Sequence, residues 1–227
     1  MPAPRLELHR VSKSYRNGAQ TTEVLHDIDL TAHAGTITAL LGRSGCGKTT
    51  LLNLAGAMDF PSSGEVRVDG RSTASLGEAD LTALRRTSVG FIFQFFQLLP
   101  TMTVLENVEL PLLLAGAPNA TATALDRLRW VGLDDKASSL PYQLSGGQMQ
   151  RVAVARATVH EPRLLIADEP TGNLDSASGD LVLGLIRESA ARFGAAVLLA
   201  THSAEAAAIA DARVRMRDGR IESIERA

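Results

Sequence analysis

The sequence predicts an α/β fold with three parts: a mostly parallel core sheet, an N-terminal antiparallel β-subdomain and a helical insert. Three observations support this prediction. Within residues 1–70, several segments alternate apolar and polar side chains, which is typical of half-buried antiparallel strands. Three other runs are short and almost wholly apolar, as expected of strands buried on both faces of a parallel sheet. Between about 95 and 160 the apolar residues follow helical spacing.

The three apolar runs are residues 36–41, 163–167 and 195–200. Polar residues come directly after each of them. If the runs are neighbouring parallel strands, those polar residues meet at one sheet edge, which is where ligands bind in open α/β sheets. The residues concerned are Gly42, Asp168, Glu169, Thr201 and His202.

Other local patterns predict the remaining elements. Alternation at 6–8, 27–30 and 66–70 indicates short strands. Residues 103–106, Thr-Val-Leu-Glu, fit a capping box at the start of a helix in the insert. Near the C-terminus, Asp218–Gly219 between two apolar runs is a strong hairpin pattern.

Composition limits the class of protein and of partner. The chain has 227 residues, 45% apolar and 21% charged, which suits a folded protein with a sizeable core. Its formal net charge of −2 offers no global attraction to polyanions, so we expect no nucleic-acid partner. Cys46 is the one cysteine, which excludes an intrachain disulfide and favours a reducing compartment.

The sequence also bears on membranes and location. The first residues lack the basic segment and apolar run of a secretory signal. The longest uncharged apolar stretch, residues 110–118, contains two prolines and is far shorter than the roughly 20 residues that a membrane span needs. We therefore expect a cytoplasmic protein with no membrane span of its own.

A phosphate-binding loop is predicted at residues 42–49, Gly-Arg-Ser-Gly-Cys-Gly-Lys-Thr, which match G-x-x-x-x-G-K-[ST] between a buried strand and a helix at 50–57. Backbone N–H groups of such a loop surround phosphate oxygens, and the helix N-terminus adds positive potential. Lys48 is expected to reach the terminal phosphates, and Thr49 to offer its hydroxyl to Mg²⁺. The predicted nucleotide-binding residues here are Gly42, Arg43, Ser44, Gly45, Cys46, Gly47, Lys48, Thr49 and Thr50.

Two adjacent carboxylates narrow the chemistry. Asp168 ends an apolar run, where it can hold the magnesium shell, and Glu169 is then placed to polarise an attacking water. No Asn-Lys-x-Asp string for guanine recognition occurs, which counts against a GTPase.

Residues 144–148, Leu-Ser-Gly-Gly-Gln, resemble the signature motif of the ATP-binding cassette (ABC) ATPases. The resemblance extends over nearly the whole chain, and its motifs occur in the family's order. Gln94 resembles the glutamine of the Q-loop, Asp175 the aspartate of the D-loop and His202 the switch histidine. Tyr15 lies where the family has an adenine-stacking aromatic residue.

The resemblance implies a P-loop NTPase of the ABC-ATPase fold: one domain over residues 1–227, with a helical subdomain at about 95–160 inserted in a RecA-like core. It implies an ABC-type translocase ATPase that uses ATP and Mg²⁺ and works as a head-to-tail dimer of two copies enclosing two ATP molecules. The implied catalytic residues are Glu169, His202, Gln94 and Lys48. The implied metal ligands are Thr49, Gln94 and Asp168. Nucleotide contacts are also implied for Tyr15 and Asp175, and from the second copy for Ser145, Gly146, Gly147 and Gln148.

Several of these residues have an ordinary structural interpretation as well. Ser145 and Gln148 fit a capping box that needs no ligand, although a capped, glycine-rich helix start is also an anion site. Tyr15 fits a plain strand aromatic, and a lone histidine such as His202 is more often structural. Gln94 becomes a hinge candidate only through its place between the sheet and the insert.

Residues 95–108 and 171–175 resemble the branch that contains lipoprotein-releasing, macrolide-efflux and cell-division ABC ATPases. This branch implies a separately encoded, permease-like integral membrane subunit that docks on the insert. It also implies a peripheral location on the inner face of the cell membrane. We expect exposed Phe95, Phe96 and Leu98 to form an apolar docking patch, although each is equally suited to the core of the insert.

Three functions are therefore compatible with the sequence. The first is the ATPase subunit of an exporter or of a complex that transmits mechanical force across the membrane. The second is a nucleotide-dependent signalling or scaffold module at the membrane, and the third is a soluble ABC ATPase in repair, translation or cluster assembly. Ser203 and Thr158 depart from the family pattern at positions that relatives commonly fill with Asp and with an apolar residue. Because of these departures, the resemblance does not identify one particular member of the branch.

Overall fold

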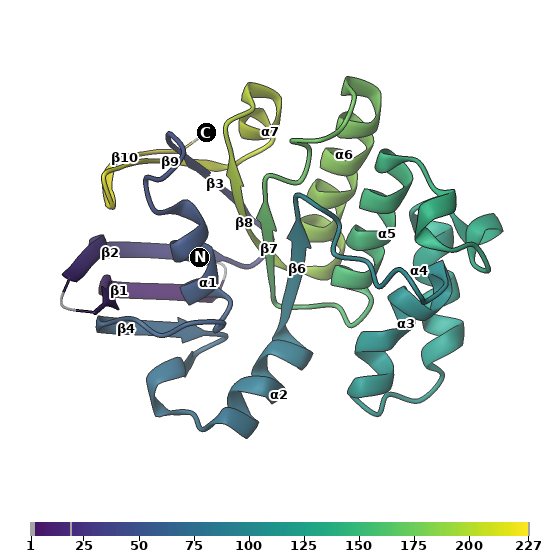
Figure 1. Ribbon diagram of the computed structural model, residues 1–227, viewed down its shortest axis with the longest axis horizontal. Coiled ribbons are helices and arrows are strands. Elements are labelled where there is room, and N and C mark those ends of the chain that lie inside the picture. Colours follow the sequence, from purple (N-terminus) through teal and green to yellow (C-terminus); the bar gives the residue numbers. More distant parts are fainter. Residues whose placement is uncertain (1–2, 19, 227) are drawn as a thin grey trace.

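The computed structural model describes residues 3–18 and 20–226, and two sheets with surrounding helices make up the molecule (Figure 1). The first sheet is antiparallel, in the order β2-β1-β4-β5. Its strands are β1 (Pro4–Asn17), β2 (Gln20–His33), β4 (Ser63–Val68) and β5 (Arg71–Ser72). The predicted antiparallel subdomain is confirmed, but β1 and β2 are long strands of 14 residues each instead of short ones. Register shifts between them, as at Leu8/Val11, divide the ladder into shorter segments.

The second sheet has six strands, in the order β10-β9-β3-β8-β7-β6. They are β3 (Ile37–Leu41), β6 (Val89–Phe93), β7 (Leu164–Asp168), β8 (Ala196–Thr201), β9 (Ala212–Arg217) and β10 (Arg220–Arg226). All neighbours pair in parallel except β9 and β10, which form the predicted hairpin. Asp218 and Gly219, at φ 45° and 73°, supply the two positive φ angles that a tight hairpin turn requires.

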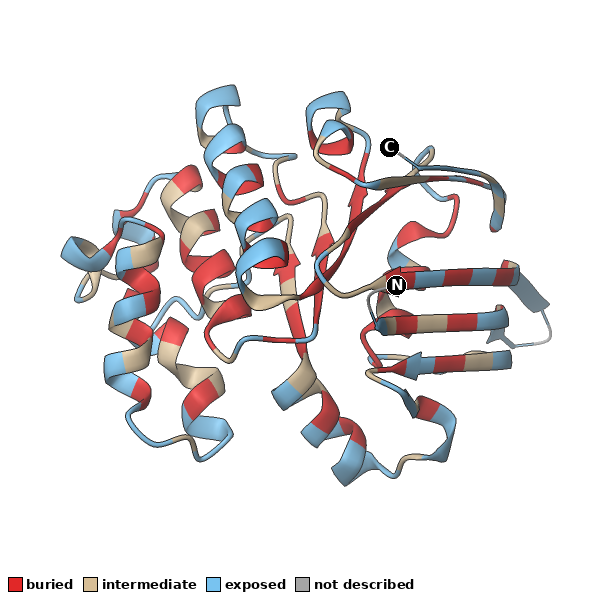
Figure 2. Cartoon of the chain, turned by 180° about the vertical axis from the view of Figure 1, so that it is seen from behind, coloured by how far each residue is buried: buried red, intermediate tan, exposed pale blue. Residues whose placement is uncertain are grey.

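Helices cover both faces of the parallel sheet. The helices of the fold are α1 (Lys48–Ala55), α2 (Glu78–Ser88), α3 (Val104–Leu114), α4 (Ala120–Trp130), α5 (Gly146–Thr158), α6 (Ser176–Phe193) and α7 (Ala204–Ala208). Helix α1 lies between the two sheets, whereas α5 and α6 cover the opposite face (Figure 1). Strand β8 packs on both sides, with Leu198 and Ala200 in one core cluster and Val197 and Leu199 in the other. Double burial explains why this strand is a continuous apolar run, and Figure 2 marks it as buried throughout.

The helical insert has a core of its own, formed by side chains of α3, α4 and α5. Residues 94–103, at the start of the predicted insert, form a loop, and the first helix begins at Val104. The predicted capping box is present: the Glu106 N–H donates to Thr103 Oγ1 at 3.2 Å, and the Thr103 N–H donates to Glu106 Oε2 at 2.7 Å. Single 3₁₀ turns occur at Thr73–Ser75, Asp134–Lys136 and Pro141–Gln143.

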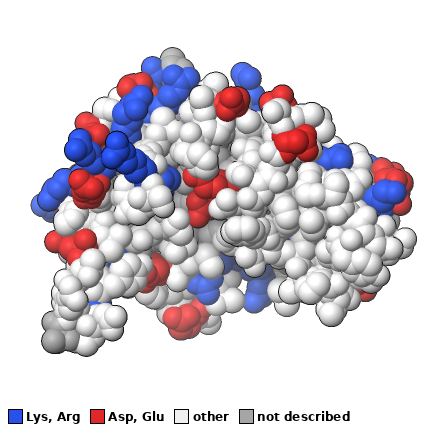
Figure 3. Space-filling model, turned by 45° about the horizontal axis from the view of Figure 1, so that its top comes forward, with Lys and Arg blue, Asp and Glu red and all other residues white. Residues whose placement is uncertain are grey.

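On the β9–β10 hairpin, arginines of β9 lie near glutamates of β10. Arg215 lies 3.5 Å from Glu225, and Arg217 lies 3.3 Å from Glu222. Figure 3 accordingly shows basic and acidic side chains intermingled on the face that includes this hairpin. In the described part of the chain, none of the helices has the length and hydrophobicity needed to cross a bilayer.

Candidate functional site

The phosphate-loop residues 42–49 connect β3 to α1, as predicted. Two positions admit only glycine. A Cβ on Gly42 would lie 2.5 Å from the Met216 carbonyl oxygen, and Gly47, at φ 104°, has the Leu25 side chain 2.7 Å from the place of its missing Cβ. The Lys48 ammonium is held inside the loop, donating to the carbonyls of Gly42 at 2.7 Å and Arg43 at 3.2 Å. The loop is therefore a tight backbone cradle with one cation in it.

A cavity of about 750 Å³ opens over this loop at the carboxyl ends of the strands. Its volume suits a nucleotide-sized ligand. Among the predicted loop residues, Cys46 alone is not part of the lining, because its side chain is buried beneath the loop, at 7% exposure. The described residues that line the cavity are Val24, Gly42, Arg43, Ser44, Gly45, Gly47, Lys48, Thr49, Thr50, Gln94, Asp168, Glu169 and His202.

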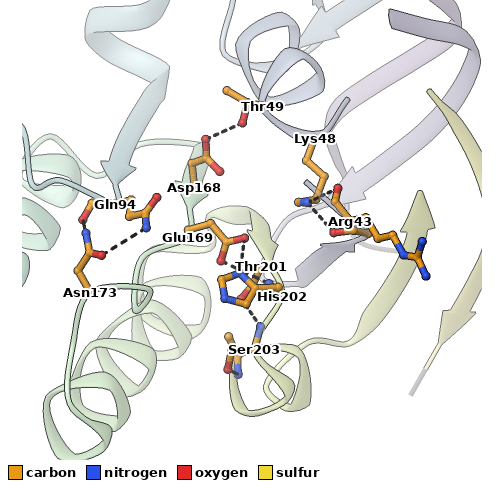
Figure 4. A network of polar contacts seen from close by, with 12 residues as sticks. Arg43, Lys48, Thr49, Gln94, Asp168, Glu169, Asn173, Thr201, His202 and Ser203 are labelled. Atoms are coloured by element: carbon orange, nitrogen blue, oxygen red, sulfur yellow. Dashed lines mark hydrogen bonds and ion pairs between the residues drawn. The ribbon is translucent and has the colours of Figure 1, made fainter. Parts of the chain in front are cut away.

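Thr49 and Asp168 face each other across the cavity, with Thr49 Oγ1 donating to Asp168 Oδ2 at 3.0 Å (Figure 4). Burial raises the pKa of Asp168 above its ordinary value, and the charge of Glu169 acts in the same direction. The Thr49 hydrogen bond and the charge of Lys48 oppose the rise in pKa. A carboxylate and a hydroxyl side by side are oxygen ligands of the type that Mg²⁺ binds, and a bound cation would favour the ionised carboxylate.

Glu169 and His202 form a pair at the ends of β7 and β8. His202 Nδ1 lies 2.9 Å from Glu169 Oε1, and the His202 backbone N–H donates to Glu169 Oε2 at 3.3 Å (Figure 4). The Glu169 side chain is 17% exposed and that of His202 is 72% exposed. The carboxylate is thus held by the histidine at the wall of the cavity, within reach of a water molecule.

Gln94 directly follows β6 and lines the same cavity. Its amide Nε2 donates to Asn173 Oδ1 at 3.4 Å, and Asn173 Nδ2 donates back to the Gln94 carbonyl at 3.3 Å (Figure 4). The sequence analysis did not predict a contact between Asn173 and Gln94. The one pattern that could have indicated it is the position of Asn173 in a polar stretch shortly after Asp168 and Glu169.

Gln150 is a second residue that sequence reasoning missed. It is fully buried in α5, and its Nε2 donates to the carbonyls of Phe93 at 3.2 Å and Pro170 at 2.7 Å. It therefore ties the residue before Gln94 to the residue after Glu169. A glutamine on the inward face of a helix was the only sign of this role in the sequence.

The signature residues do not line the cavity. Ser145 caps α5, because its Oγ accepts from the Gln148 N–H at 3.3 Å while Gln148 Oε1 accepts from the Ser145 N–H at 2.9 Å. A Cβ on Gly147 would lie 2.4 Å from Ser178 Oγ, so this turn of α5 packs closely on α6. The start of α5 is therefore a capped, glycine-rich helix N-terminus that is not part of the cavity over the phosphate loop of the same chain.

Asp175 and Tyr15 are also absent from the described lining residues. Asp175 caps α6 by accepting from the Ser178 N–H at 2.9 Å, and this hydrogen bond is the largest cause of its lowered pKa. Tyr15, on β1, is 43% exposed, and its hydroxyl donates to Asp59 Oδ2 at 2.9 Å. Burial is the largest cause of the raised pKa of Tyr15, followed by its hydrogen bond to Asp59.

The proposed docking patch and the two departures from the family pattern have local explanations. Phe95 is 68% exposed as expected, whereas Phe96 and Leu98 are half-buried. Leu98 packs on the core of the insert, which was the alternative expectation. Ser203 caps α7 by accepting from the Ala206 N–H at 3.1 Å. The buried Thr158 hydroxyl donates to the Val154 carbonyl at 2.8 Å within its own helix, which lets a polar residue occupy an apolar position.

Comparison with known proteins agrees with this geometry. The family model described as ABC transporter matches residues 25–172. The lipoprotein-releasing system ATP-binding protein LolD of Shewanella denitrificans is 45% identical over 216 residues, covering 94% of this chain and 93% of that protein. The macrolide export ATP-binding/permease protein MacB 1/2 of Paracoccus denitrificans is 48% identical over 96% of this chain, which spans 33% of that protein.

A solved structure supports the same assignment. The ATP-binding cassette MJ0796, in a dimeric post-hydrolysis state bound to ADP and Pi, superposes with a TM-score of 0.90 at 37% identity. The match covers 97% of this chain and 98% of that one. Since fold, motif order and near full-length similarity agree, this chain belongs to the ABC transporter family and is an ATP-binding, ATP-hydrolysing cassette of an ABC system.

Proposed function

We propose that the phosphates of ATP lie in the cradle of residues 42–50, where backbone N–H groups and Lys48 neutralise their charge. The observation that carries the proposal is the single cavity that gathers this loop with Gln94, Asp168, Glu169 and His202. Lys48 is already inside the loop and exchanges its two carbonyl acceptors for phosphate oxygens when nucleotide binds. Cys46 contributes its backbone to the cradle.

The metal proposed for this site is Mg²⁺, held by Thr49, Asp168 and Gln94. The donor set fits: a hydroxyl and a carboxylate oxygen lie 3.0 Å apart, and the Gln94 amide lines the same cavity. The described residues include no cluster of three His, Cys, Asp or Glu side chains. One carboxylate together with substrate phosphates is the usual mode of Mg²⁺ binding in phosphoryl transfer. When bound, Mg²⁺ supplies positive charge that stabilises the transferring phosphoryl group.

Glu169 and His202 are proposed to act on the attacking water. Glu169 accepts a hydrogen bond from the water and orients its oxygen toward the γ-phosphorus, while His202 holds the carboxylate through the 2.9 Å contact. The new bond joins the water oxygen to phosphorus, and the bond to the bridging oxygen of ADP breaks. The products are ADP and phosphate, and the proton of the water leaves through the carboxylate or the phosphate.

A second copy of the chain is proposed to complete each site. The signature residues Ser145, Gly146, Gly147 and Gln148 form an anion site outside the cavity of their own chain, which supports a head-to-tail dimer in which they cover the partner's ATP. Asp175 lies beside them at the start of α6. The dimeric state of the related cassette MJ0796 also supports this arrangement.

The partner proposed for the dimer is a separate integral membrane subunit, which makes the chain peripheral on the inner face of the cell membrane. The names of LolD and of MacB, an ATP-binding/permease protein, support this partner. So does a groove of about 450 Å³ between α2, β6 and α3, whose apolar lining includes Phe91, Phe93, Leu110, Pro111 and Leu114. We further propose that residues 1–227 act as one domain, with the helical subdomain at about 95–160 as its movable part.

Co-expression with a candidate permease tests the role. The proposal predicts that the chain co-purifies with the permease in detergent and that its ATPase activity rises in the complex. Substrate release or flux in reconstituted vesicles would then identify an exporter. A nucleotide-dependent complex without flux would favour a signalling or scaffold module, and stable capture of a soluble partner alone would contradict the membrane assignment.

A further inference from the structure

Three side chains, those of Lys13 and Tyr15 on β1 and of Asp59 after α1, form a polar cluster. Lys13 Nζ donates to Asp59 Oδ1 at 2.7 Å and to the Phe60 carbonyl at 2.7 Å. The other oxygen of the same carboxylate, Asp59 Oδ2, accepts from the Tyr15 hydroxyl at 2.9 Å. Asp59 thus uses both oxygens to hold two residues of strand β1.

The cluster leaves only one face of the Tyr15 ring open. Lys13 and Tyr15 are two residues apart on β1 and so point to the same side of the strand. The Lys13 ammonium lies 4.8 Å from the ring centroid, while the Lys13 residue is 9% exposed. One ring face is covered by a buried cation, so a planar base can stack only on the opposite face.

Asp59 also connects this ring to the phosphate-binding helix. The backbone N–H groups of Met58 and Asp59 donate to the Asn53 carbonyl in α1 at 2.9 and 3.3 Å. The carboxylate that holds Tyr15 is therefore tied to the helix whose first residues are Lys48 and Thr49. A short chain of contacts sets the separation between the aromatic ring and the phosphate cradle.

We propose that Asp59 and Lys13 are positioning residues for nucleotide binding, because they orient the Tyr15 ring for stacking with the base and fix its distance from the phosphate loop. This proposal rests on the proposed role of Tyr15 in nucleotide binding. Other hydrogen bonds also connect the loop after α1 to β1. The Ser14 N–H donates to Ser62 Oγ at 2.9 Å, and the Ser62 N–H donates to the Ser12 carbonyl at 2.8 Å. Loss of the cluster should therefore leave the loop attached to β1.

The test measures the affinities for Mg-ADP and Mg-pyrophosphate by calorimetry, since pyrophosphate has no base to stack. Tyr15→Phe keeps the ring and removes the hydroxyl, whereas Asp59→Ala removes the acceptor. Each variant should bind ADP roughly three- to tenfold more weakly, the size of one net hydrogen bond, and should bind pyrophosphate unchanged. The double variant should lose less ADP affinity than the sum of the two single losses, because both changes break the hydrogen bond between Tyr15 and Asp59. Asp59→Asn, which retains an oxygen acceptor, should recover part of the affinity.

Controls separate the possible failures. Tyr15→Ala should weaken ADP binding about tenfold through lost stacking, and if it does not, the role of Tyr15 and this inference both fail. If Tyr15→Ala weakens ADP binding but Asp59→Ala does not, the positioning role of Asp59 is wrong and the stacking role of Tyr15 is retained. Equal losses for ADP and pyrophosphate, or additive losses in the double variant, would mean a general structural role and also overturn the proposal. Asp135→Ala, which removes the exposed pair with Lys136 at 3.2 Å, is the matched control and should change neither affinity.

Discussion

Glu169 occupies a backbone conformation that few residues other than glycine adopt, with φ at 47°. Its N–H donates to the Ala200 carbonyl on the neighbouring strand at 2.9 Å, which holds the turn after β7 in place. A left-handed non-glycine residue costs about 1 kcal/mol or more, so the surrounding contacts have to hold it in place. The turn places the carboxylate beside His202 at the wall of the cavity, where the proposed attacking water would lie.

The first prediction concerns this carboxylate. Glu169→Gln should lower the ATPase rate by about 100-fold or more, because an amide is a poor proton acceptor, while ADP affinity changes little. Steady-state phosphate release and calorimetry measure the two quantities. Glu205→Gln, which changes an exposed glutamate on α7, is the control and should keep normal turnover. Turnover near normal in Glu169→Gln would rule out the proposed role.

Lys48 supplies the second prediction. Lys48→Ala should weaken Mg-ADP binding by about tenfold to 100-fold, since charge-assisted hydrogen bonds to the phosphates are lost. The variant should fold normally, because the lost bonds to the Gly42 and Arg43 carbonyls lie next to solvent in the cavity. Lys136→Ala removes an exposed lysine elsewhere and serves as the control. Unchanged ADP affinity in Lys48→Ala would contradict the phosphate assignment.

At the scale of elements, two helices of the insert begin with the same device for different purposes. Helices α3 and α5 both start with a reciprocal capping box, formed by Thr103 with Glu106 and by Ser145 with Gln148. The hydrogen bonds satisfy N–H groups that the first turn leaves free. Only the α5 box encloses two glycines, Gly146 and Gly147, so that no side chain covers the first turn of this helix.

This contrast gives the third prediction. Thr103→Ala and Ser145→Ala should each lower the free energy of unfolding by about 1 kcal/mol, the usual cost of losing a cap. Only Ser145→Ala should also reduce the ATPase rate, because only that hydroxyl is proposed to contact the partner's nucleotide. Urea unfolding and steady-state ATPase assays measure both. Equal ATPase losses in the two variants would indicate that stability alone explains the effect.

The junction of α5 with β6 yields the fourth prediction, on pH. His160 Nε2 donates to the Val89 carbonyl at 3.2 Å, and its buried Nδ1 has no hydrogen-bond partner among the described residues. Burial lowers the pKa of His160 from its ordinary value of 6.5, so the folded state favours the neutral ring. Stability should therefore be complete above pH 6.5 and fall as pH drops toward the lowered folded pKa, by at most about 1.4 kcal/mol per pH unit.

Urea unfolding between pH 5 and 7.5 checks this effect against two variants. His160→Gln keeps a donor for Val89 and should flatten the fall below pH 6.5. His9→Gln, which changes a half-exposed imidazole near Glu7, should leave the pH profile as it is. A profile that is identical in the native chain and in His160→Gln would exclude this histidine as the cause.

At the scale of the whole molecule, the parts of the fold that sequence predicted are those with a single physical cause. Double burial makes β3, β7 and β8 continuous apolar runs, and the phosphate loop has a required spacing of glycines and lysine. The site residues that follow these strands were placed together for that reason. Contacts between residues far apart in the chain leave no comparable pattern in the sequence. The hydrogen bond of Gln94 to Asn173 and that of Gln150 to the Pro170 carbonyl were therefore not predicted. The long, bulged strands β1 and β2 likewise depend on partners far along the chain.

The arrangement of the whole molecule also bears on the proposed dimer. The cavity is lined by the phosphate loop together with Glu169 and His202, whereas the capped start of α5 is not part of its lining. The two features belong to different layers, the parallel sheet and the helical insert. In the proposed head-to-tail pair each α5 start would lie over the other chain's cavity, and assembly would then depend on bound ATP.

Gly146→Asp tests this dependence without disturbing the single chain. A Cβ on Gly146 would meet only Leu174 and Phe96 side chains at 3.8 Å, an ordinary contact, and an acidic residue in the first turn suits the helix dipole. Melting temperature and ADP affinity should therefore stay unchanged. Across the dimer, however, the new carboxylate would face the partner's phosphates and repel them.

In the Glu169→Gln background, ATP should convert the chain into a dimer detectable by light scattering, and adding Gly146→Asp should keep it monomeric at the same ATP concentration. Gly184→Asp is the matched control, because a side chain at that exposed helical position would meet no atom within 4 Å. The control should dimerise normally. If the dimer forms equally well with Gly146→Asp, the start of α5 does not cover the partner's nucleotide.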